Sequence, residues 1–192
     1  MFLKDYIPNL NQKFTNVNFS GIAFDSSKVK KNYIFFAIKG KIFDGNSYIK
    51  DAIKKGAKIV ISEKKIIKKN TKTIFLFHPN VRKLLAEIAY KISNKKLKKL
   101  VAVTGTNGKS SIADFYYQIL KLNSKKVASI GTMGLKYNNK KRILDNTTSD
   151  PIQISSILTE LKKKKIEFVI MEASSHGLKQ NRLDGLKFNS GI

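Results

Sequence analysis

Two kinds of segment alternate along the chain. Short runs dominated by apolar residues, which are typical of buried strands, occupy residues 33–38, 58–62, 73–77, 100–104, 126–130 and 166–171. Segments with apolar residues three and four positions apart, which are typical of helices, occupy residues 46–55, 81–92, 110–122 and a stretch that begins at 151. In the second part of the chain, strands that alternate with helices predict a parallel α/β architecture.

Residues at the segment ends support these assignments. Gly56 can end the helix 46–55, while Asn80 and Asp150 can cap the helices that follow them, and Pro151 suits a first helical turn. The polar segment 93–99 resembles a domain boundary, so we expect one domain at residues 1–97 and a second at 98–192. We expect the second sheet to be incomplete, because the chain stops soon after its third predicted strand.

A glycine-rich stretch, TGTNGKS at residues 104–110, joins the strand 100–104 to the helix 110–122. Backbone amides in such a turn and the following helix N-terminus attract phosphate oxygens. Lys109 would reach the β- and γ-phosphates, and the Ser110 hydroxyl would ligate Mg²⁺. The general pattern G-x-x-x-x-G-K-[ST] fails at Val103, where its first glycine would stand. The remaining pattern still predicts a nucleotide site.

Two more polar clusters follow predicted strands or precede a predicted helix. Glu172 follows the strand 166–171, at the sheet edge where open α/β sheets bind ligands, and its carboxylate suits a second Mg²⁺ ligand; a solvated loop carboxylate is the alternative. His176 could orient Glu172, contact a substrate or cap the loop. Helix capping explains Asp150, but it does not explain the amide and hydroxyls of residues 146–148.

Composition narrows the classes of function. The net charge of +25 would suit a nucleic-acid binder, but all but three of the 38 basic residues are lysines spread along the chain. We therefore expect solvated lysine surfaces that attract anionic substrates, and no nucleic-acid partner. The absence of cysteine excludes disulfides and cysteine metal sites. With no apolar run near the ~20 residues of a membrane span, we expect no membrane partner and a cytoplasmic location. We also expect a monomer.

These motifs together resemble the Mur ligases, and specifically the UDP-N-acetylmuramoyl-tripeptide synthetases, the MurE branch. The loop TGTNGKS is similar to their ATP loop but is shared with folylpolyglutamate synthases. The stretches DNTTSDP (145–151) and MEASSHGLKQNRLDGLKF (171–188) are more specific to the branch. The stretches GIAFDSSKV, YIFFAIKG and DGNSYIKDAIKKGAKIVIS resemble its UDP-sugar-binding domain.

The resemblance implies a fold and a reaction. The fold is α/β: a small N-terminal UDP-sugar-binding domain followed by an incomplete P-loop parallel-sheet ATPase domain. The reaction is an ATP-dependent amide ligation of peptidoglycan synthesis, with ATP and Mg²⁺ as cofactors. It joins a diamino acid, meso-diaminopimelate or L-lysine, to UDP-MurNAc-L-Ala-D-Glu through an acyl phosphate. The family's C-terminal domain would lie beyond Ile192, so we expect this chain alone to be inactive.

The resemblance also implies site residues. The ATP loop consists of Gly105, Thr106, Asn107, Gly108, Lys109, Ser110 and Ser111. Lys109 and Glu172 are the implied catalytic residues, and Ser110 and Glu172 the implied metal ligands. Implied contacts with the UDP-sugar come from Phe24, Ser26, Lys41, Ile42 and Phe43. Implied contacts with the muramoyl-peptide come from Asn146, Thr147, Thr148, Ser174, Gln180 and Arg182. The chain departs from the family at Ser27, where arginine is usual, and at Ser149, where proline is common.

Other interpretations stay open from the sequence alone. The chain could belong to another Mur-type ligase or to a folylpolyglutamate-type ligase, and exchange of the acceptor substrate would discriminate between them. It could also be a truncated module that only binds a nucleotide or a UDP-sugar. A basic nucleic-acid binder would show a steep salt dependence of DNA or RNA retention.

Overall fold

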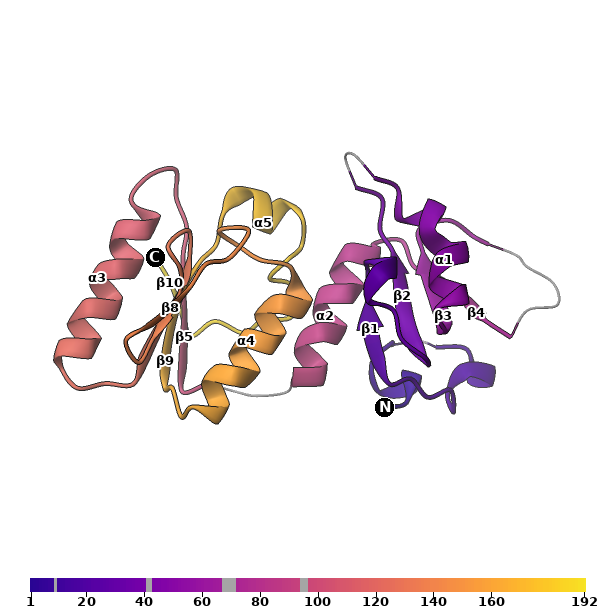
Figure 1. Cartoon of the computed structure of the whole chain (residues 1–192), viewed down its shortest axis with the longest axis horizontal. Helices are drawn as coiled ribbons and strands as arrows, with labels where there is room; N and C mark the ends of the chain where they lie inside the picture. The colour runs from indigo at the N-terminus through magenta and orange to yellow at the C-terminus, as the bar shows by residue number, and fades with distance from the viewer. Residues whose placement is uncertain (9, 41–42, 67–71, 94–96) are drawn as a thin grey trace. The chain divides into compact units, whose positions relative to one another are not determined.

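The computed structural model describes residues 1–8, 10–40, 43–66, 72–93 and 97–192. The chain forms two compact units, Met1–Ile88 and Ala89–Ile192, each with its own sheet (Figure 1). The division falls within helix α2 (Val81–Ser93), N-terminal to the polar segment where the sequence pattern predicts a boundary. Among the described residues, no helix is both long enough and apolar enough to cross a membrane.

The first unit is built on a parallel sheet of order β1-β2-β3-β4. Its strands are β1 (Gly21–Ala23), β2 (Tyr33–Ala37), β3 (Ala57–Ser62) and β4 (Ile74–Phe77). Helix α1 (Ile49–Lys54) follows a 3₁₀ turn at Gly45–Tyr48, and further 3₁₀ turns lie at Leu3–Asp5, Gln12–Phe14 and Ser26–Lys28. The three strands predicted here are confirmed, whereas the three-residue β1 is too short to give a hydrophobic pattern.

Side-chain alternation divides the core of the first unit between the two faces of the sheet. Phe35 and Val60 pack in one cluster with Ala52 of α1. The other face carries Ile34, Phe36, Ile59 and Ile61, which are fully buried. Because both faces of a parallel sheet are covered, its central strands are nearly continuous apolar runs, which made them easy to predict.

The second unit has a mixed sheet of order β10-β5-β9-β6-β7-β8. Its strands are β5 (Lys99–Val103), β6 (Val127–Gly131), β7 (Gly134–Tyr137), β8 (Lys140–Arg142), β9 (Phe168–Glu172) and β10 (Ser190–Gly191). Its helices are α3 (Lys109–Leu122), α4 (Pro151–Lys163) and α5 (Ser175–Lys179). Helix α3 lies on one side of this sheet, and α4 and α5 lie on the other (Figure 1).

The second sheet is not purely parallel. Strands β10, β5, β9 and β6 run parallel, but β7 and β8 continue the sheet as an antiparallel hairpin after β6. Asn138 and Asn139 form the turn of this hairpin with φ of 46° and 61°. A two-residue turn with left-handed backbone matches the right-handed twist of the strands that it joins. The chain also adds β10 beside β5, beyond the strands predicted from the pattern.

The helix ends agree with the predicted signals. Asn80 accepts a hydrogen bond from the Lys83 amide at 2.9 Å, and Asp150 accepts one from the Gln153 amide at 3.0 Å. Pro151 occupies the first turn of α4. Gly56, which follows α1, has a φ of +103° that favours glycine.

Register brings three loops of the second unit to one sheet edge. Val103 of β5 pairs with Glu172 of β9, and Ile130 of β6 pairs with Met171. The segments that follow β5, β6 and β9 therefore leave the sheet side by side, at the carboxyl ends of parallel strands.

Candidate functional site

The glycine-rich loop occupies the junction between β5 and α3. Gly105 and Gly108 have φ of +137° and +80°, values at which a side chain would be strained, and Gly108 is the N-cap of α3. The first turn of this 14-residue helix begins at Lys109 and contains Ser110 and Ser111. Amides of a first turn have no partner within the helix, so the loop presents donors to an anion. Thr106 and Asn107 are exposed within it.

Lys109 folds back over this loop. Its ammonium donates hydrogen bonds to the carbonyl oxygens of Gly105 at 2.6 Å and Thr106 at 3.1 Å. These carbonyls are neutral acceptors, and a phosphate would offer the ammonium a charged one. The lysine is therefore placed over the loop where a bound polyphosphate would meet it.

The Glu172 carboxylate is buried at the end of β9, with only 2% of the residue exposed. Its Oε1 accepts a hydrogen bond from the Thr132 amide at 3.0 Å. Its Oε2 accepts hydrogen bonds from the hydroxyls of Ser110 and Thr132, both at 3.0 Å. The sheet register thus brings together Ser110 of the loop and Glu172, the two residues predicted to ligate a metal ion.

Gly131 makes room for this carboxylate. A Cβ atom at Gly131 would lie 2.2 Å from Glu172 Oε1 and 2.4 Å from Cδ. Both distances are far inside van der Waals contact. We refer to Ser110, Gly131 and Thr132, which surround the carboxylate, as the Glu172 clamp.

Among the residues that the structure describes, Glu172 has no counter-ion. Within the described ranges, no lysine, arginine or histidine forms an ion pair with it, and no group of three or more metal-ligating side chains occurs. A buried carboxylate without a cation is costly. One carboxylate and one hydroxyl in contact are oxygen ligands of the kind that Mg²⁺ prefers when phosphates and waters complete its shell. The residues present therefore fit a magnesium ion bound together with a nucleotide.

The segment before α4 joins this cluster. Thr147 Oγ1 lies 2.9 Å from Thr132 Oγ1. Thr148 is 1% exposed; its hydroxyl donates to the backbone oxygen of Glu172 at 2.9 Å and accepts from the Ser174 amide at 3.0 Å. Asn146 is exposed. The three residues differ in placement: Thr148 supports the strand end, whereas Asn146 and Thr147 are nearer to solvent.

Arg182 orders a second row of polar side chains. Its guanidinium donates to the Thr148 backbone oxygen, and through Nε at 3.1 Å and Nη2 at 2.8 Å to Gln180 Oε1. The Gln180 amide nitrogen then faces His176 Nε2 at 2.8 Å. Because that nitrogen can only donate, His176 accepts at Nε2 and carries its hydrogen on Nδ1. Gln180 thus orients the His176 ring, and the role of His176 stays open.

Tyr90 anchors Arg182 from the other side. The Tyr90 hydroxyl donates to the backbone oxygen of Arg182 at 2.5 Å. Burial raises the pKa of Tyr90 above its usual range, so the phenol stays neutral and remains a donor.

The residues predicted to contact a UDP-sugar lie in the first unit. Lys41 and Ile42 are outside the described residues. Phe43 is 67% exposed, and its backbone oxygen accepts a hydrogen bond from the Gly40 amide at 2.8 Å. Phe24 is half-buried. Ser26 is only 8% exposed, and its hydrogen bond is the main cause that lowers the pKa of Asp51 on α1, so the Ser26 hydroxyl faces the helix.

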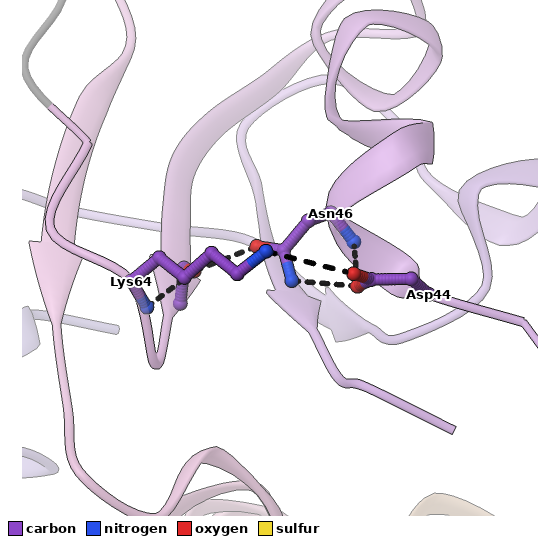
Figure 2. Close-up of polar contacts among 4 residues, drawn as sticks. Asp44, Asn46 and Lys64 are labelled. Atoms are coloured by element: carbon purple, nitrogen blue, oxygen red, sulfur yellow. Dashed lines mark hydrogen bonds and ion pairs between the residues drawn. The ribbon is translucent and has the colours of Figure 1, made fainter. Parts of the chain in front are cut away.

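Polar contacts fix the chain next to Phe43 (Figure 2). Asp44 accepts hydrogen bonds from the Asn46 amide at 2.9 Å and from its side chain at 2.6 Å; the amide bond holds the pKa of Asp44 below its usual range. The Ser62 hydroxyl at the end of β3 donates to Asn46 Oδ1 at 2.7 Å, and the Lys64 ammonium lies 3.8 Å from Asp44. The chain after β2 is thereby tied to the end of β3.

Comparison with known proteins agrees with this geometry. The model of the Mur ligase family, catalytic domain, matches residues 18–98, and that of the Mur ligase middle domain matches residues 103–192. The chain belongs to the Mur ligase family.

Relatives of this Mur ligase chain include ligases named for diaminopimelate. One is the UDP-N-acetylmuramoyl-L-alanyl-D-glutamate--2,6-diaminopimelate ligase of Rickettsia prowazekii (strain Madrid E), to which this chain is 41% identical over 185 residues. The aligned region covers 94% of this chain and 38% of that protein. This chain is also 40% identical over 196 residues to the ligase of the same name from Buchnera aphidicola subsp. Schizaphis graminum (strain Sg). That alignment covers 97% of this chain and 38% of the relative. The chain therefore spans about two fifths of the length of these relatives.

Solved structures give the same fold. A structure of UDP-N-acetylmuramoyl-L-alanyl-D-glutamate--2,6-diaminopimelate ligase matches all of this chain and 39% of its own, with a TM-score of 0.84 and 28% identity. The MurF ligase from Thermotoga maritima in complex with ADP matches 80% of this chain and 32% of its own, with a TM-score of 0.52 and 25% identity. The α/β fold expected from the sequence is confirmed.

Sequence reasoning on this Mur ligase chain missed Gly131, Thr132 and Gly177. A Cβ atom at Gly177 would lie 2.7 Å from Thr148 Cβ, so that glycine lets α5 approach Thr148 closely. Their location in the sequence could have identified Gly131 and Thr132 as site residues. They directly follow the predicted strand 126–130, as Glu172 follows the predicted strand 166–171. The rule that ligands bind at the carboxyl ends of parallel strands applied equally to both.

Proposed function

We propose that this Mur ligase chain carries the nucleotide site and the first-substrate sites of an ATP-dependent ligase that adds diaminopimelate to UDP-MurNAc-L-Ala-D-Glu. The observation that carries the proposal is the buried Glu172 carboxylate, which is 3.0 Å from Ser110, the residue after Lys109 of the glycine-rich loop. The names of relatives about 40% identical supply the substrate and favour diaminopimelate over lysine. We also propose that the protein is cytoplasmic and monomeric and that it does not bind nucleic acid.

In this proposal the loop binds ATP. Amides of residues 105–111 hold phosphate oxygens, and Lys109 exchanges the carbonyls of Gly105 and Thr106 for the terminal phosphates. Ser110 and Glu172 would hold Mg²⁺, which supplies neutralisation of the phosphate charge when it is bound. Lys109 adds a second positive charge at the transferring group. This arrangement suits phosphorylation of a carboxylate to an acyl phosphate, which an amine then attacks with release of phosphate.

The remaining predicted residues are assigned to the acceptor. Thr147, Ser174, Gln180 and Arg182 belong to the hydrogen-bonded rows beside Glu172, and with Asn146 they would bind the muramoyl-peptide. Thr148 would act through the backbone that it supports. In the first unit, Phe24, Ser26 and Phe43, together with Lys41 and Ile42, would bind the UDP-sugar.

The test is calorimetric titration of the chain with UDP-MurNAc-L-Ala-D-Glu and, separately, with a dihydropteroate acceptor of the folylpolyglutamate type. We expect saturable binding of the UDP-dipeptide only. Arg182→Ala should weaken it about tenfold or more, because hydrogen bonds to charged groups contribute about 1.5–3 kcal/mol each.

Arg142→Ala is the matched control, because it removes an equal charge from β8, where Arg142 pairs with Glu160 instead of contacting the site. Its affinity for the UDP-dipeptide should stay within about twofold of the unmodified chain. Binding of the pteroate acceptor, or equal losses from the two arginine variants, would contradict the acceptor assignment.

A further inference from the structure

The Glu172 clamp contains one residue that contacts both carboxylate oxygens. We propose that Thr132 is a positioning residue that holds Glu172 in the orientation needed to ligate the divalent cation of the nucleotide. This inference rests on the proposed function, and it assigns a role to a residue that the sequence motifs do not include.

Thr132 grips the carboxylate at two points. Its amide donates to Oε1 and its hydroxyl donates to Oε2, each at 3.0 Å. Two donors on two different oxygens restrict rotation of the carboxylate about its last bond. Ser110 contacts Oε2 alone, and its own oxygen is a predicted metal ligand. Thr132 is therefore the partner that can keep its bonds to Glu172 when a cation is bound.

The proton count agrees with this role. A carboxylate only accepts, so the single hydroxyl proton of Thr132 lies toward Glu172. In the 2.9 Å contact between Thr132 and Thr147, Thr147 must then be the donor. The bond from Thr147 thus holds the Thr132 hydroxyl in the orientation that serves Glu172.

Gly131 restricts the carboxylate from the side. Because a Cβ atom there would lie 2.2 Å from Oε1, the backbone of β6 forms a wall against which the carboxylate packs. The carboxylate position is therefore set by the end of β6 as well as by its own strand.

The Thr132 donors are uncharged, so they leave the negative charge of the Glu172 carboxylate in place. A lysine or arginine in the place of Thr132 would orient Glu172 but would cancel the charge that attracts a cation. An amide and a hydroxyl orient the carboxylate without neutralising it. Outer contacts of this kind commonly change metal affinity by about 10–100-fold when they are removed.

The experiment measures Mn²⁺ binding to the full chain by electron paramagnetic resonance of free Mn²⁺, in the presence of a non-hydrolysable ATP analogue. Thr132→Val keeps the shape and removes the hydroxyl, and should raise the Mn²⁺ dissociation constant about tenfold or more. Thr132→Ser restores the hydroxyl and should stay within about threefold of the unmodified chain. Gly131→Ala, which displaces the carboxylate, should weaken Mn²⁺ binding as well.

Two controls separate positioning from general damage. Thr159→Val removes a hydroxyl that bonds within α4 to the Ser155 oxygen, and should leave Mn²⁺ affinity within about twofold. Affinity for the analogue in EDTA should be the same for Thr132→Val and the unmodified chain.

The outcomes are distinguishable. If the unmodified chain binds no analogue and no Mn²⁺, the proposed function is overturned and this inference with it. If the unmodified chain binds both and Thr132→Val binds Mn²⁺ equally well, the inference alone is overturned. A loss that Thr132→Ser does not rescue also contradicts it, because the serine hydroxyl should restore the bond to Oε2.

Discussion

Each hydroxyl near Glu172 has a single proton, and the contacts show where each proton lies. Ser110 and Thr132 donate to the carboxylate, Thr148 donates to the Glu172 backbone oxygen, and Ser174 must then donate to Thr148 at 3.1 Å. The hydroxyls of Thr147 and Ser174 can therefore only accept from a ligand. A ligand that binds these two residues must present N–H or O–H groups, as a peptide or a sugar does.

Ser149 breaks this pattern. It is 0% exposed, and its hydroxyl is the single buried side-chain polar atom without a hydrogen-bond partner among the residues that the structure describes. An unpaired buried hydroxyl costs about 1–3 kcal/mol. We expect Ser149→Ala to raise the free energy of unfolding by about 1 kcal/mol in urea denaturation.

Ser155→Ala is the matched control for Ser149→Ala. The Ser155 hydroxyl is also buried, but it donates to the Ala89 oxygen at 2.8 Å. Its loss removes a buried hydrogen bond, so this variant should lose about 1 kcal/mol. Destabilisation of similar size in both variants would contradict the description of Ser149 as unpaired.

At the scale of elements, length and burial decided what could be predicted. The central strands β2, β3, β5 and β9 are buried apolar runs, and their positions follow from the sequence alone. Strands β1 and β10 have three and two residues, too few for a pattern, and sheet pairing defines them. The β7–β8 hairpin carried a turn signal, Asn138-Asn139, but its outer strand is exposed and lysine-rich.

Site residues could be predicted from the sequence when they belong to a motif within one continuous segment. Lys109 and Ser110 begin α3 directly after the glycine-rich loop, and Glu172 ends β9. The chemistry of all three is evident from residue type. The contacts of Thr132 and Gly131 with Glu172 depend on pairing between β6 and β9, whose segments are about 40 positions apart. No local pattern encodes which strands become neighbours, so this part required the structure.

Glu160 links α4 to the hairpin in a pH-dependent way. It accepts a hydrogen bond from the Tyr137 hydroxyl at 2.5 Å and pairs with Arg142 at 3.1 Å. The Tyr137 bond, followed by the Arg142 charge, lowers the pKa of Glu160; the same bond raises the pKa of Tyr137. A lowered carboxyl pKa contributes stability above the unfolded value of 4.5, which is lost as pH falls through the folded pKa.

We therefore expect Glu160→Gln to lower the free energy of unfolding by about 1 kcal/mol at pH 7, with the difference shrinking as the pH falls below 4.5. Urea denaturation at several pH values measures this. Glu167→Gln is the control, because its pair with Lys98 is exposed, so its effect should be smaller at pH 7. A Glu160→Gln difference that grows toward acid pH would contradict the assignment.

At the scale of the whole molecule, charge complicates any binding experiment. The net charge of +25 attracts ATP and UDP-sugars to many lysines, so weak retention of an anion says little about a site. The contribution of the glycine-rich loop must be separated from this background. A variant that changes the net charge equally, at a lysine far from the loop in the sequence, provides that separation.

Calorimetric titration of the chain with ATP, in the presence and absence of Mg²⁺, is the sharpest test of the nucleotide site. We expect saturable, Mg²⁺-enhanced binding that Lys109→Ala weakens about 10–100-fold. Lys163→Ala, at an exposed position on α4, should leave the affinity within about twofold. Binding that is indifferent to Mg²⁺, or equal losses in the two lysine variants, would contradict the assignment of the loop as the nucleotide site.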